Sequence, residues 1–320
     1  MPLDPRAQRL LSMVAAAAPE NKDRPTPEQR RLSLKKLMQF ARNDCGAVTT
    51  QDGQITGPAG ALPYRLYTSV ETASDTTHIR LPGFVFFHGG GLVAGSIETH
   101  DKVAAALAAA SGCRLLSVDY RLAPEHEFPA AIDDALAAVE FVLDHGAALG
   151  IDSDRIVVGG DSAGATLAAY VCQYAAAVTN LEIAAQCLIC PVLDFSHPWP
   201  SRDLFGTGYL IDKATWQADL ADYLAEEIAA DDPRISPLCT PELAGLAPAV
   251  IHTAEFDPMR DEGNAYAARL VDAGVTVSHV CHDGMIHNFH ALGAILPQAK
   301  TAFELIGQQI RSLLQTRAPG

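Results

Sequence analysis

The sequence has few positive charges and no long apolar run. Lys and Arg together number 23 against 38 Asp and Glu, which gives a formal net charge of −15. Because an anionic surface repels phosphate groups, this balance argues against nucleic acid or an anionic membrane as a partner. No stretch approaches the roughly 18 consecutive apolar residues of a membrane-spanning helix, so we expect no stable membrane insertion. The hydrophobic fraction of 48% is that of a globular chain.

Cysteine is uncommon and irregularly spaced. The seven cysteines are Cys45, Cys113, Cys172, Cys187, Cys190, Cys239 and Cys281. Most lie in apolar stretches, where a free thiol behaves as a small apolar group. Neither the C-x-x-C pair at 187–190 nor the histidines between 279 and 290 have partners at metal-ligand spacing. We therefore expect no metal and a reducing compartment, the cytoplasm.

The N-terminal part of the chain is expected to be helical. The segment MPLDPRAQRLLSMVAAAAPE carries Asp4 and Arg6 before a short apolar run that Ser12 interrupts. It lacks the basic region and continuous apolar segment of a signal peptide, so we expect a helix instead. A second helix is expected after the prolines near residue 25, and residues 1–45 form one helical region.

From residue 84 onward, apolar segments alternate with amphipathic helices, and no internal repeat is found. Strands are expected at 84–91, 114–122, 155–160, 184–195, 248–258 and 275–284. Continuous apolar strands that alternate with helices are typical of an α/β protein with a mostly parallel sheet, covered by helices on both faces. Before this region, the segment 63–69 alternates like an antiparallel strand.

One segment, residues 195–245, departs from this alternation. It contains several prolines and short helical stretches between two expected strands. Together with residues 1–45, it is expected to form a helical cap over the carboxyl ends of the strands, where ligands bind in open parallel sheets.

The stretch GGDSAGATLAAY, residues 159–170, places Ser162 between two glycines at the joint of an expected strand and helix. This is the context of a nucleophile elbow, a sharp turn that lifts the serine hydroxyl clear of the sheet. Gly160 and Gly164 leave room where the two backbones approach each other. The amide of Ala163 then lies at the helix N-terminus, where it can face a developing anion.

A serine becomes a good nucleophile only with a base to take its proton and a group to orient that base. His287 follows the last expected strand and Asp257 ends the strand before it. The order serine, acid, histidine is that of the α/β-hydrolase fold, and all three residues follow carboxyl ends of strands. We therefore predict Ser162, Asp257 and His287 as a catalytic triad.

The run HGGG, residues 88–91, follows another expected strand. Its glycines expose backbone N–H groups that no side chain shields. With the amide of Ala163, those of Gly89 and Gly90 are predicted to bind the oxyanion of a tetrahedral intermediate. His88 is expected to brace this glycine loop rather than to take part in catalysis.

Several motifs together resemble the hormone-sensitive lipase family of esterases, bacterial family IV. They are HGGG (88–91), YRLAPE (120–125), GDSAG (160–164), the Asp-Pro of DPMRDEG (257–263) and GMIHNF (284–289). The resemblance implies an α/β-hydrolase catalytic domain at 46–320, with 195–245 as its cap insertion. It also implies short-chain ester substrates and no cofactor. We predict a serine esterase that hydrolyses short- to medium-chain carboxylic esters through an acyl-enzyme. Candidate cis bonds are Ala123–Pro124 and Phe128–Pro129.

Some properties stay open at this stage. The aromatic and apolar residues of the inserted segment either line the acyl pocket or only pack the cap; the candidates are Phe205, Tyr209, Leu210 and Trp216. The same triad also serves amidases and lactone hydrolases, and some relatives of this fold are non-catalytic ligand receptors that have lost the histidine. The partner expected is a small-molecule ester, and a homodimer is left open.

Overall fold

Eight strands form one sheet in the computed structural model, in the order β1-β2-β4-β3-β5-β6-β7-β8. The structure describes residues 1–17, 24–42, 45–74, 80–178, 181–224 and 228–315. The strands are β1 (Val48–Gly57), β2 (Gly60–Ser69), β3 (Leu81–Phe87), β4 (Arg114–Val118), β5 (Ile151–Asp161), β6 (Ala185–Ile189), β7 (Ala249–Phe256) and β8 (Val277–Ile286).

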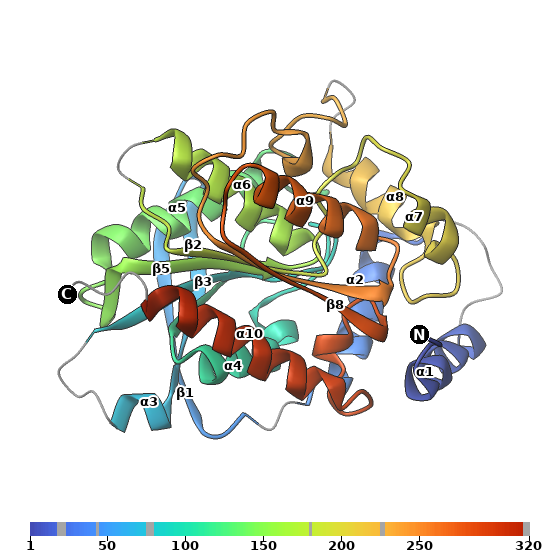
Figure 1. Cartoon of the computed structure of the whole chain (residues 1–320), viewed down its shortest axis with the longest axis horizontal. Coiled ribbons are helices and arrows are strands. Elements are labelled where there is room, and N and C mark those ends of the chain that lie inside the picture. Colours follow the sequence, from blue (N-terminus) through green and yellow to red (C-terminus); the bar gives the residue numbers. More distant parts are fainter. Residues whose placement is uncertain (18–23, 43–44, 75–79, 179–180, 225–227, 316–320) are drawn as a thin grey trace.

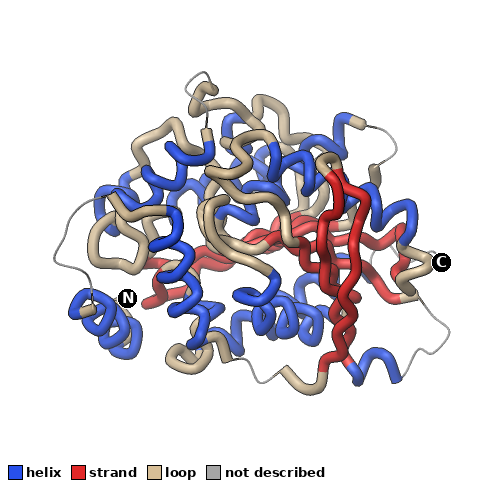
Figure 2. The backbone as a smooth tube through the Cα atoms, turned by 180° about the vertical axis from the view of Figure 1, so that it is seen from behind, coloured by secondary structure: helices blue, strands red, loops and turns tan. Residues whose placement is uncertain are grey.

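The sheet is parallel from β4 to β8 and antiparallel at its N-terminal edge. β1 pairs with β2, and β2 with β4, in antiparallel register, while the five pairings that join β4, β3, β5, β6, β7 and β8 are parallel. The expectation of a mostly parallel sheet is thus confirmed. The long β1–β2 pair lies at the end of the sheet remote from the N-terminal helix (Figure 2).

Helices cover both faces of this sheet. The longer ones are α1 (Pro5–Ala16), α2 (Pro27–Leu37), α4 (Ile97–Ser111), α5 (Ala130–His145), α6 (Ala163–Ala177), α8 (Lys213–Tyr223), α9 (Arg260–Asp272) and α10 (Gln298–Gln315). The short ones are α3 (Val70–Ser74), α7 (Pro200–Phe205) and the 3₁₀ helices η1 (Met38–Phe40), η2 (Pro237–Cys239) and η3 (Phe289–Ala291). Helices α5, α6 and α9 lie on one face, and α4 and α10 on the other (Figure 1).

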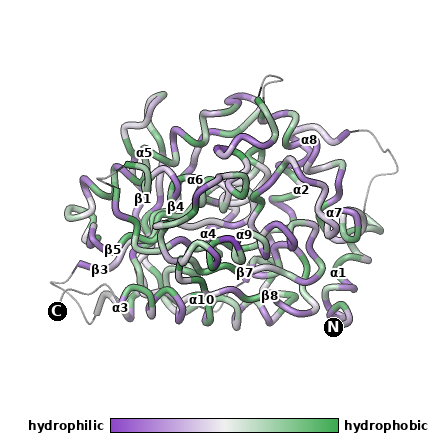
Figure 3. The backbone as a smooth tube through the Cα atoms, turned by 45° about the horizontal axis from the view of Figure 1, so that its top comes forward, coloured by the Kyte–Doolittle hydropathy of each residue, from purple (hydrophilic) through white to green (hydrophobic). Residues whose placement is uncertain are grey.

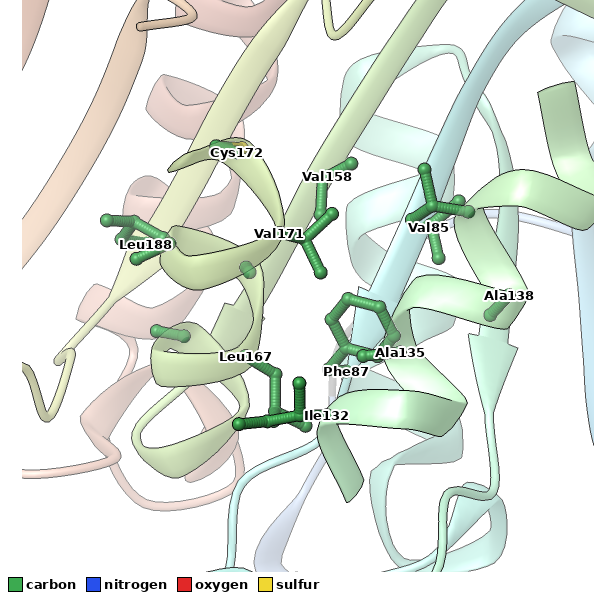
Figure 4. Close-up of a cluster of buried hydrophobic side chains, with 14 of the residues drawn as sticks. Val85, Phe87, Ile132, Ala135, Ala138, Val158, Leu167, Val171, Cys172 and Leu188 are labelled. Carbon is green, nitrogen blue, oxygen red and sulfur yellow. The ribbon is translucent and has the colours of Figure 1, made fainter. Parts of the chain in front are cut away.

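The core consists of two layers, one on each face of the sheet. In one layer, Ile132 and Ala135 of α5 and Leu167 of α6 meet Phe87 of β3 and Val158 of β5 (Figure 4). All five side chains are at most 4% exposed. Both hydrophobic and hydrophilic residues occur along the covering helices (Figure 3), as expected for helices with one face on a core and the other in water.

Helices α1, α2, α7 and α8 lie together at one end of the sheet (Figure 1). Leu34 of α2 and Asp219 of α8 lie against Gly90 and Gly91, which directly follow the carboxyl end of β3. The N-terminal region and the inserted segment therefore meet at the carboxyl ends of the strands. Parts of both, residues 18–23, 43–44 and 225–227, lie outside the described residues.

The peptide bonds Ala123–Pro124 and Phe128–Pro129 are both cis, as expected. No helix within the described part of the chain is long and apolar enough to span a bilayer.

The contact between α10 and α4 depends on a glycine. A Cβ on Gly307 would overlap the backbone of Ala110 and lie 2.8 Å from its Cβ. We predict that Gly307→Val lowers the free energy of unfolding by about 2 kcal/mol, because overpacking forces the helices apart. Urea unfolding would measure the loss. The matched control is Gln308→Val, on the exposed face of the same helix, and an equal loss in both variants would contradict the prediction.

Candidate active site

Ser162 occupies a strained turn between β5 and α6. Its φ of 52° and ψ of −121° lie outside the regions that a residue with a Cβ normally adopts. Its neighbours over-determine this conformation: the Ser162 N–H donates to the carbonyl of Ile189 at 2.9 Å, and its carbonyl accepts from Ala165 at 3.0 Å. The side chain is 5% exposed. The predicted elbow is therefore present as a backbone feature.

The two glycines of the elbow are required by close backbone approach. A Cβ on Gly160 would run into the backbone of Gly164, and a Cβ on Gly164 would run into the carbonyl oxygen of Phe87. Strand β3, the turn and the first turn of α6 thus touch through backbone atoms alone. The end of β3, where the glycine loop begins, is brought directly against the serine turn.

The three residues predicted as a triad lie in one hydrogen-bonded chain. His287 Nε2 lies 3.0 Å from Ser162 Oγ, and His287 Nδ1 lies 2.8 Å from Asp257 Oδ2. The other carboxylate oxygen of Asp257 accepts from the Met259 N–H at 2.8 Å. Asp257 and His287 are both fully buried. An imidazole held in this way with Nδ1–H toward the carboxylate presents its unprotonated Nε2 to the serine hydroxyl.

The glycine loop is tied to the residue before the serine. The N–H of Gly89 donates to Asp161 Oδ1 at 2.9 Å, and both groups are buried. This hydrogen bond occupies the Gly89 amide, so the structure does not support its predicted role as an oxyanion donor. The physical reason is that Asp161, at the end of β5, points its carboxylate back at the start of the loop.

Three other amides near Ser162 remain without an acceptor. Within the described residues, no acceptor is found for the backbone N–H groups of Gly90, Gly91 and Ala163. Gly90 and Gly91 have φ values of 127° and 67°, which favour glycine. Of the amides predicted from the sequence, those of Gly90 and Ala163 thus remain free, and the amide of Gly91 is free as well.

The His88 side chain at the start of the glycine loop is packed between two other rings. Its ring stacks on Tyr120 at 4.4 Å and on His100 at 5.3 Å between centroids. The Tyr120 hydroxyl donates to the His88 carbonyl at 2.6 Å. Burial, together with the nearby His100, lowers the pKa of His88 to about 3. A neutral, buried and stacked ring matches the bracing role expected from the sequence.

Asp161 lies between two histidines of different elements. His100 Nε2 of α4 and His290 Nε2 of η3 lie 3.5 Å and 3.7 Å from its Oδ2 atom. Burial by itself would raise the pKa of Asp161, but His100 and His290 lower it well below its usual range. An ionised carboxylate is thus held under the elbow, where it can accept the Gly89 amide.

The predicted pocket residues fall into two groups. Phe205 and Tyr209 pack on Phe256, which precedes Asp257, with ring centroids 5.4 Å and 5.9 Å away. Trp216 lies apart from them on α8, beneath the guanidinium of Arg202 at 4.9 Å. Leu210, with a φ of 76°, is partly buried against the core layer of α4 and α10. The aromatic pair therefore borders the acid end of the triad, and Trp216 belongs to the inner side of α8.

Potential metal-ligating atoms gather at one place among the described residues. Atoms of Cys190, Asp257 and His287 lie within 4.8 Å of one another. Two of these residues form the hydrogen-bonded chain with Ser162. Burial raises the pKa of the Cys190 thiol well above its usual range, so this cysteine is a protonated, weak ligand.

Sequence reasoning missed three residues that shape this site. Gly91 belongs to the HGGG motif and Asp161 to the GDSAG motif, so these motifs could have indicated both residues. Asp219 carries no such signal, because its position against Gly91 arises from the folding of α8 over the loop.

Comparison with known proteins identifies the family to which the chain is similar. The family described as alpha/beta hydrolase fold matches residues 84–291. Carboxylic ester hydrolase LipN of Mycobacterium tuberculosis is 40% identical over 248 residues, which are 76% of this chain and 64% of that protein. Ethyl acetate hydrolase of Pseudomonas putida is 36% identical over 271 residues, which are 84% of this chain and 82% of that protein.

A solved structure extends the likeness to nearly the whole chain. An ester hydrolase from the metagenome of Lake Arreo, complexed with a derivative of bipyridine phosphonate, superposes with a TM-score of 0.91 at 37% identity. The match covers 97% of this chain and 98% of that one.

A buried serine, histidine and aspartate on this sheet define a serine hydrolase. The chain belongs to the α/β-hydrolase fold family, in its hormone-sensitive lipase type. Its enzyme class is carboxylic ester hydrolase.

The hydrogen bond between the Gly89 amide and Asp161 should be required for full activity. Asp161→Ala leaves the buried Gly89 amide without an acceptor, and we expect kcat for p-nitrophenyl butyrate to fall about 100-fold as the loop shifts. Asp161→Asn keeps an acceptor oxygen and should lose less. Asp154→Ala, at an exposed position of the same strand, is the control. Full activity in a folded Asp161→Ala protein would contradict the prediction.

Proposed function

We propose that Ser162 is the nucleophile, His287 the general base and Asp257 the group that orients it. The observation that carries this proposal is the unbroken chain of hydrogen-bond distances, 3.0 Å and 2.8 Å, from Oγ through the imidazole to the carboxylate. Asp257 stabilises the imidazolium that forms when His287 takes the serine proton. The Met259 amide keeps Asp257 in place through its second oxygen.

The proposed oxyanion hole consists of the amides of Gly90, Gly91 and Ala163. All three lack an acceptor within the described part of the chain. Ala163 is the first residue of α6, so the positive end of the helix dipole adds to its N–H. Each such donor contributes about 3–4 kcal/mol to stabilising the transition state.

In the proposed reaction, Ser162 Oγ bonds to the ester carbonyl carbon while its proton moves to His287 Nε2. The tetrahedral intermediate collapses, the bond to the alcohol oxygen breaks, and His287 returns the proton to the departing alcohol. Water then attacks the acyl-enzyme with His287 again as base. The acid leaves and Ser162 regains its proton, so the cycle uses one water and no cofactor.

We assign residues 1–45 and 195–245 to a cap over this site, and 46–320 to the catalytic domain. Leu34 of α2 and Asp219 of α8 lie directly on the glycine loop, and Ser162 is 5% exposed. Such a roof bounds the substrate pocket, which supports short- to medium-chain esters as substrates. Phe205, Tyr209, Leu210 and Trp216 are proposed to border it.

The surroundings of the enzyme are also inferred. Cys113, Cys172, Cys187, Cys190, Cys239 and Cys281 are free thiols, which supports a reducing location such as the cytoplasm. The net charge of −15 supports a small-molecule ester, without nucleic acid, as the partner.

The nucleophile is tested by covalent labelling. A p-nitrophenyl phosphonate should add one phosphonyl group to Ser162, because its tetrahedral phosphorus mimics the intermediate. Intact-mass analysis should show the adduct in the wild type and none in Ser162→Ala, whose kcat should fall by about 10⁴-fold or more. Ser96→Ala, which removes the N-cap of α4, is the control and should still be labelled. A labelled and active Ser162→Ala protein would overturn the assignment.

Because the proposed cap encloses the substrate pocket, we expect a limit on the length of the acyl chain. Across p-nitrophenyl esters from acetyl to palmitoyl, kcat/KM should be greatest at butyryl or hexanoyl and fall for longer chains, because the bounded pocket cannot enclose them. A maximum of kcat/KM at palmitoyl, with activation by emulsified substrate, would contradict the assignment of a bounded pocket.

A further inference from the structure

Arg30 joins the N-terminal helix α2 to the cap helix α8 beside the glycine loop. Its side chain is 5% exposed and forms ion pairs with both Asp219 and Asp222 of α8. Arg24 adds a second link, at 2.5 Å to Asp222 and 3.0 Å to the carbonyl of Ala218. A guanidinium with two carboxylates at fixed positions holds α8 in one register on α2.

This clamp places a carboxyl group against the proposed oxyanion hole. A Cβ on Gly91 would overlap the carboxyl group of Asp219, and a Cβ on Gly90 would lie 3.0 Å from Leu34 of α2. Asp219 is therefore in contact with the loop that carries two of the three free amides. An ester whose carbonyl oxygen reaches those amides brings its neighbouring atoms close to Asp219.

One oxygen of Asp219 remains available. Oδ1 accepts from Arg30, whereas Oδ2, the atom nearest to Gly91, accepts no hydrogen bond from the described residues. Elsewhere on α8, Trp216 packs beneath Arg202 and Tyr223 packs on Phe128, so neither ring contacts Asp219 in the described contacts. Asp219 therefore places a polar oxygen against the loop at a position where an alkyl-binding wall would be apolar.

The charges around Asp219 restrict the kind of substrate group that it can bind. Arg30 and Arg24 balance the charges of Asp219 and Asp222, and the guanidinium beside Asp219 would repel a substrate cation. Burial raises the pKa of Asp219 to about 7, against the lowering by Arg30. A carboxyl group near its pKa at neutral pH can accept or donate a hydrogen bond. A hydroxyl group, which also does both, fits this place better than an ammonium group or an alkyl chain.

We propose that Asp219 is a specificity-determining residue that binds a hydroxyl group of the substrate, so that small hydroxy esters are the preferred substrate class. The inference rests on the proposed function, because it requires the ester carbonyl to lie at Gly90, Gly91 and Ala163. A bare alkyl group at this place leaves Asp219 Oδ2 desolvated and without a partner, which costs binding free energy.

The test compares matched esters in which a hydroxyl replaces a methyl group. On the acyl side the pair is ethyl 3-hydroxybutyrate and ethyl 3-methylbutyrate; on the alcohol side it is 2-hydroxyethyl acetate and propyl acetate. Acid release in a pH-stat gives kcat/KM for each. In Asp219→Leu, the hydroxyl-to-methyl ratio should fall about tenfold or more for at least one pair, since a lost hydrogen-bond partner discriminates on that scale.

Two further variants control for loss of the other carboxylate and for a failure of Asp219→Leu to fold. Asp222→Asn alters the other carboxylate bound to Arg30 but not the group against Gly91, so its ratios should stay within twofold of the wild type. The double variant Arg30→Met, Asp219→Leu removes the buried cation together with Asp219, leaves Asp222 paired with Arg24, and covers the case in which Asp219→Leu does not fold. It should show the same fall in ratio.

The outcomes separate this inference from the proposed function. Unchanged ratios for both pairs in a folded Asp219 variant that is still labelled by phosphonate at Ser162 would overturn the role of Asp219 alone. Absence of labelling at Ser162 in the wild type would overturn the proposed function itself. A fall in ratio with labelling intact supports both.

Discussion

The close approach of three backbones around Ser162 is the constraint on which the rest of the site depends. The end of β5, the first turn of α6 and the end of β3 meet where Gly160 and Gly164 have no side chains. This close approach requires the unfavourable positive φ of Ser162. Hydrogen bonds with Ile189 and Ala165 stabilise that backbone conformation. Because β3 ends against the elbow, the glycine loop cannot lie elsewhere.

Buried charge then sets the shape of the loop. Asp161 anchors the first loop glycine through the Gly89 amide, which leaves the following amides free. Its negative charge is tolerated in the core because His100 and His290 face it. From the other side, α2 reaches the same region: Arg31 donates to the carbonyl of Val93 at 2.8 Å and pairs with Glu125 at 2.5 Å.

The proposed cap is connected to the glycine loop through the contacts between α2 and α8. The ion pairs of Arg30 with Asp219 and Asp222 connect α2 and α8 across the glycine loop. A buried ion pair that lost one partner would leave an uncompensated charge, so the two helices are held as one unit. This unit lies against Gly90 and Gly91 through Leu34 and Asp219, so in the proposed function it bears on substrate choice rather than on the chemical step.

Local sequence determined much of this protein. Apolar strands that alternate with helices gave the parallel sheet, because a strand buried on both faces needs a continuous apolar run. The GDSAG motif located the elbow, since only glycines permit that turn, and chain order identified Asp257 and His287. The antiparallel strand β1 escaped notice because its burial is slight and irregular, so its residues show no strong alternation.

Only the tertiary structure decided which amides of the glycine loop stay without an acceptor and which residues lie against them. HGGG offers several N–H groups, and the choice among them depends on Asp161, which belongs to a different strand. Asp219 meets Gly91, and Leu34 meets Gly90, across large separations in sequence. Contacts between distant segments leave no local period or motif, because they are selected by how the helices pack and not by what neighbouring residues prefer.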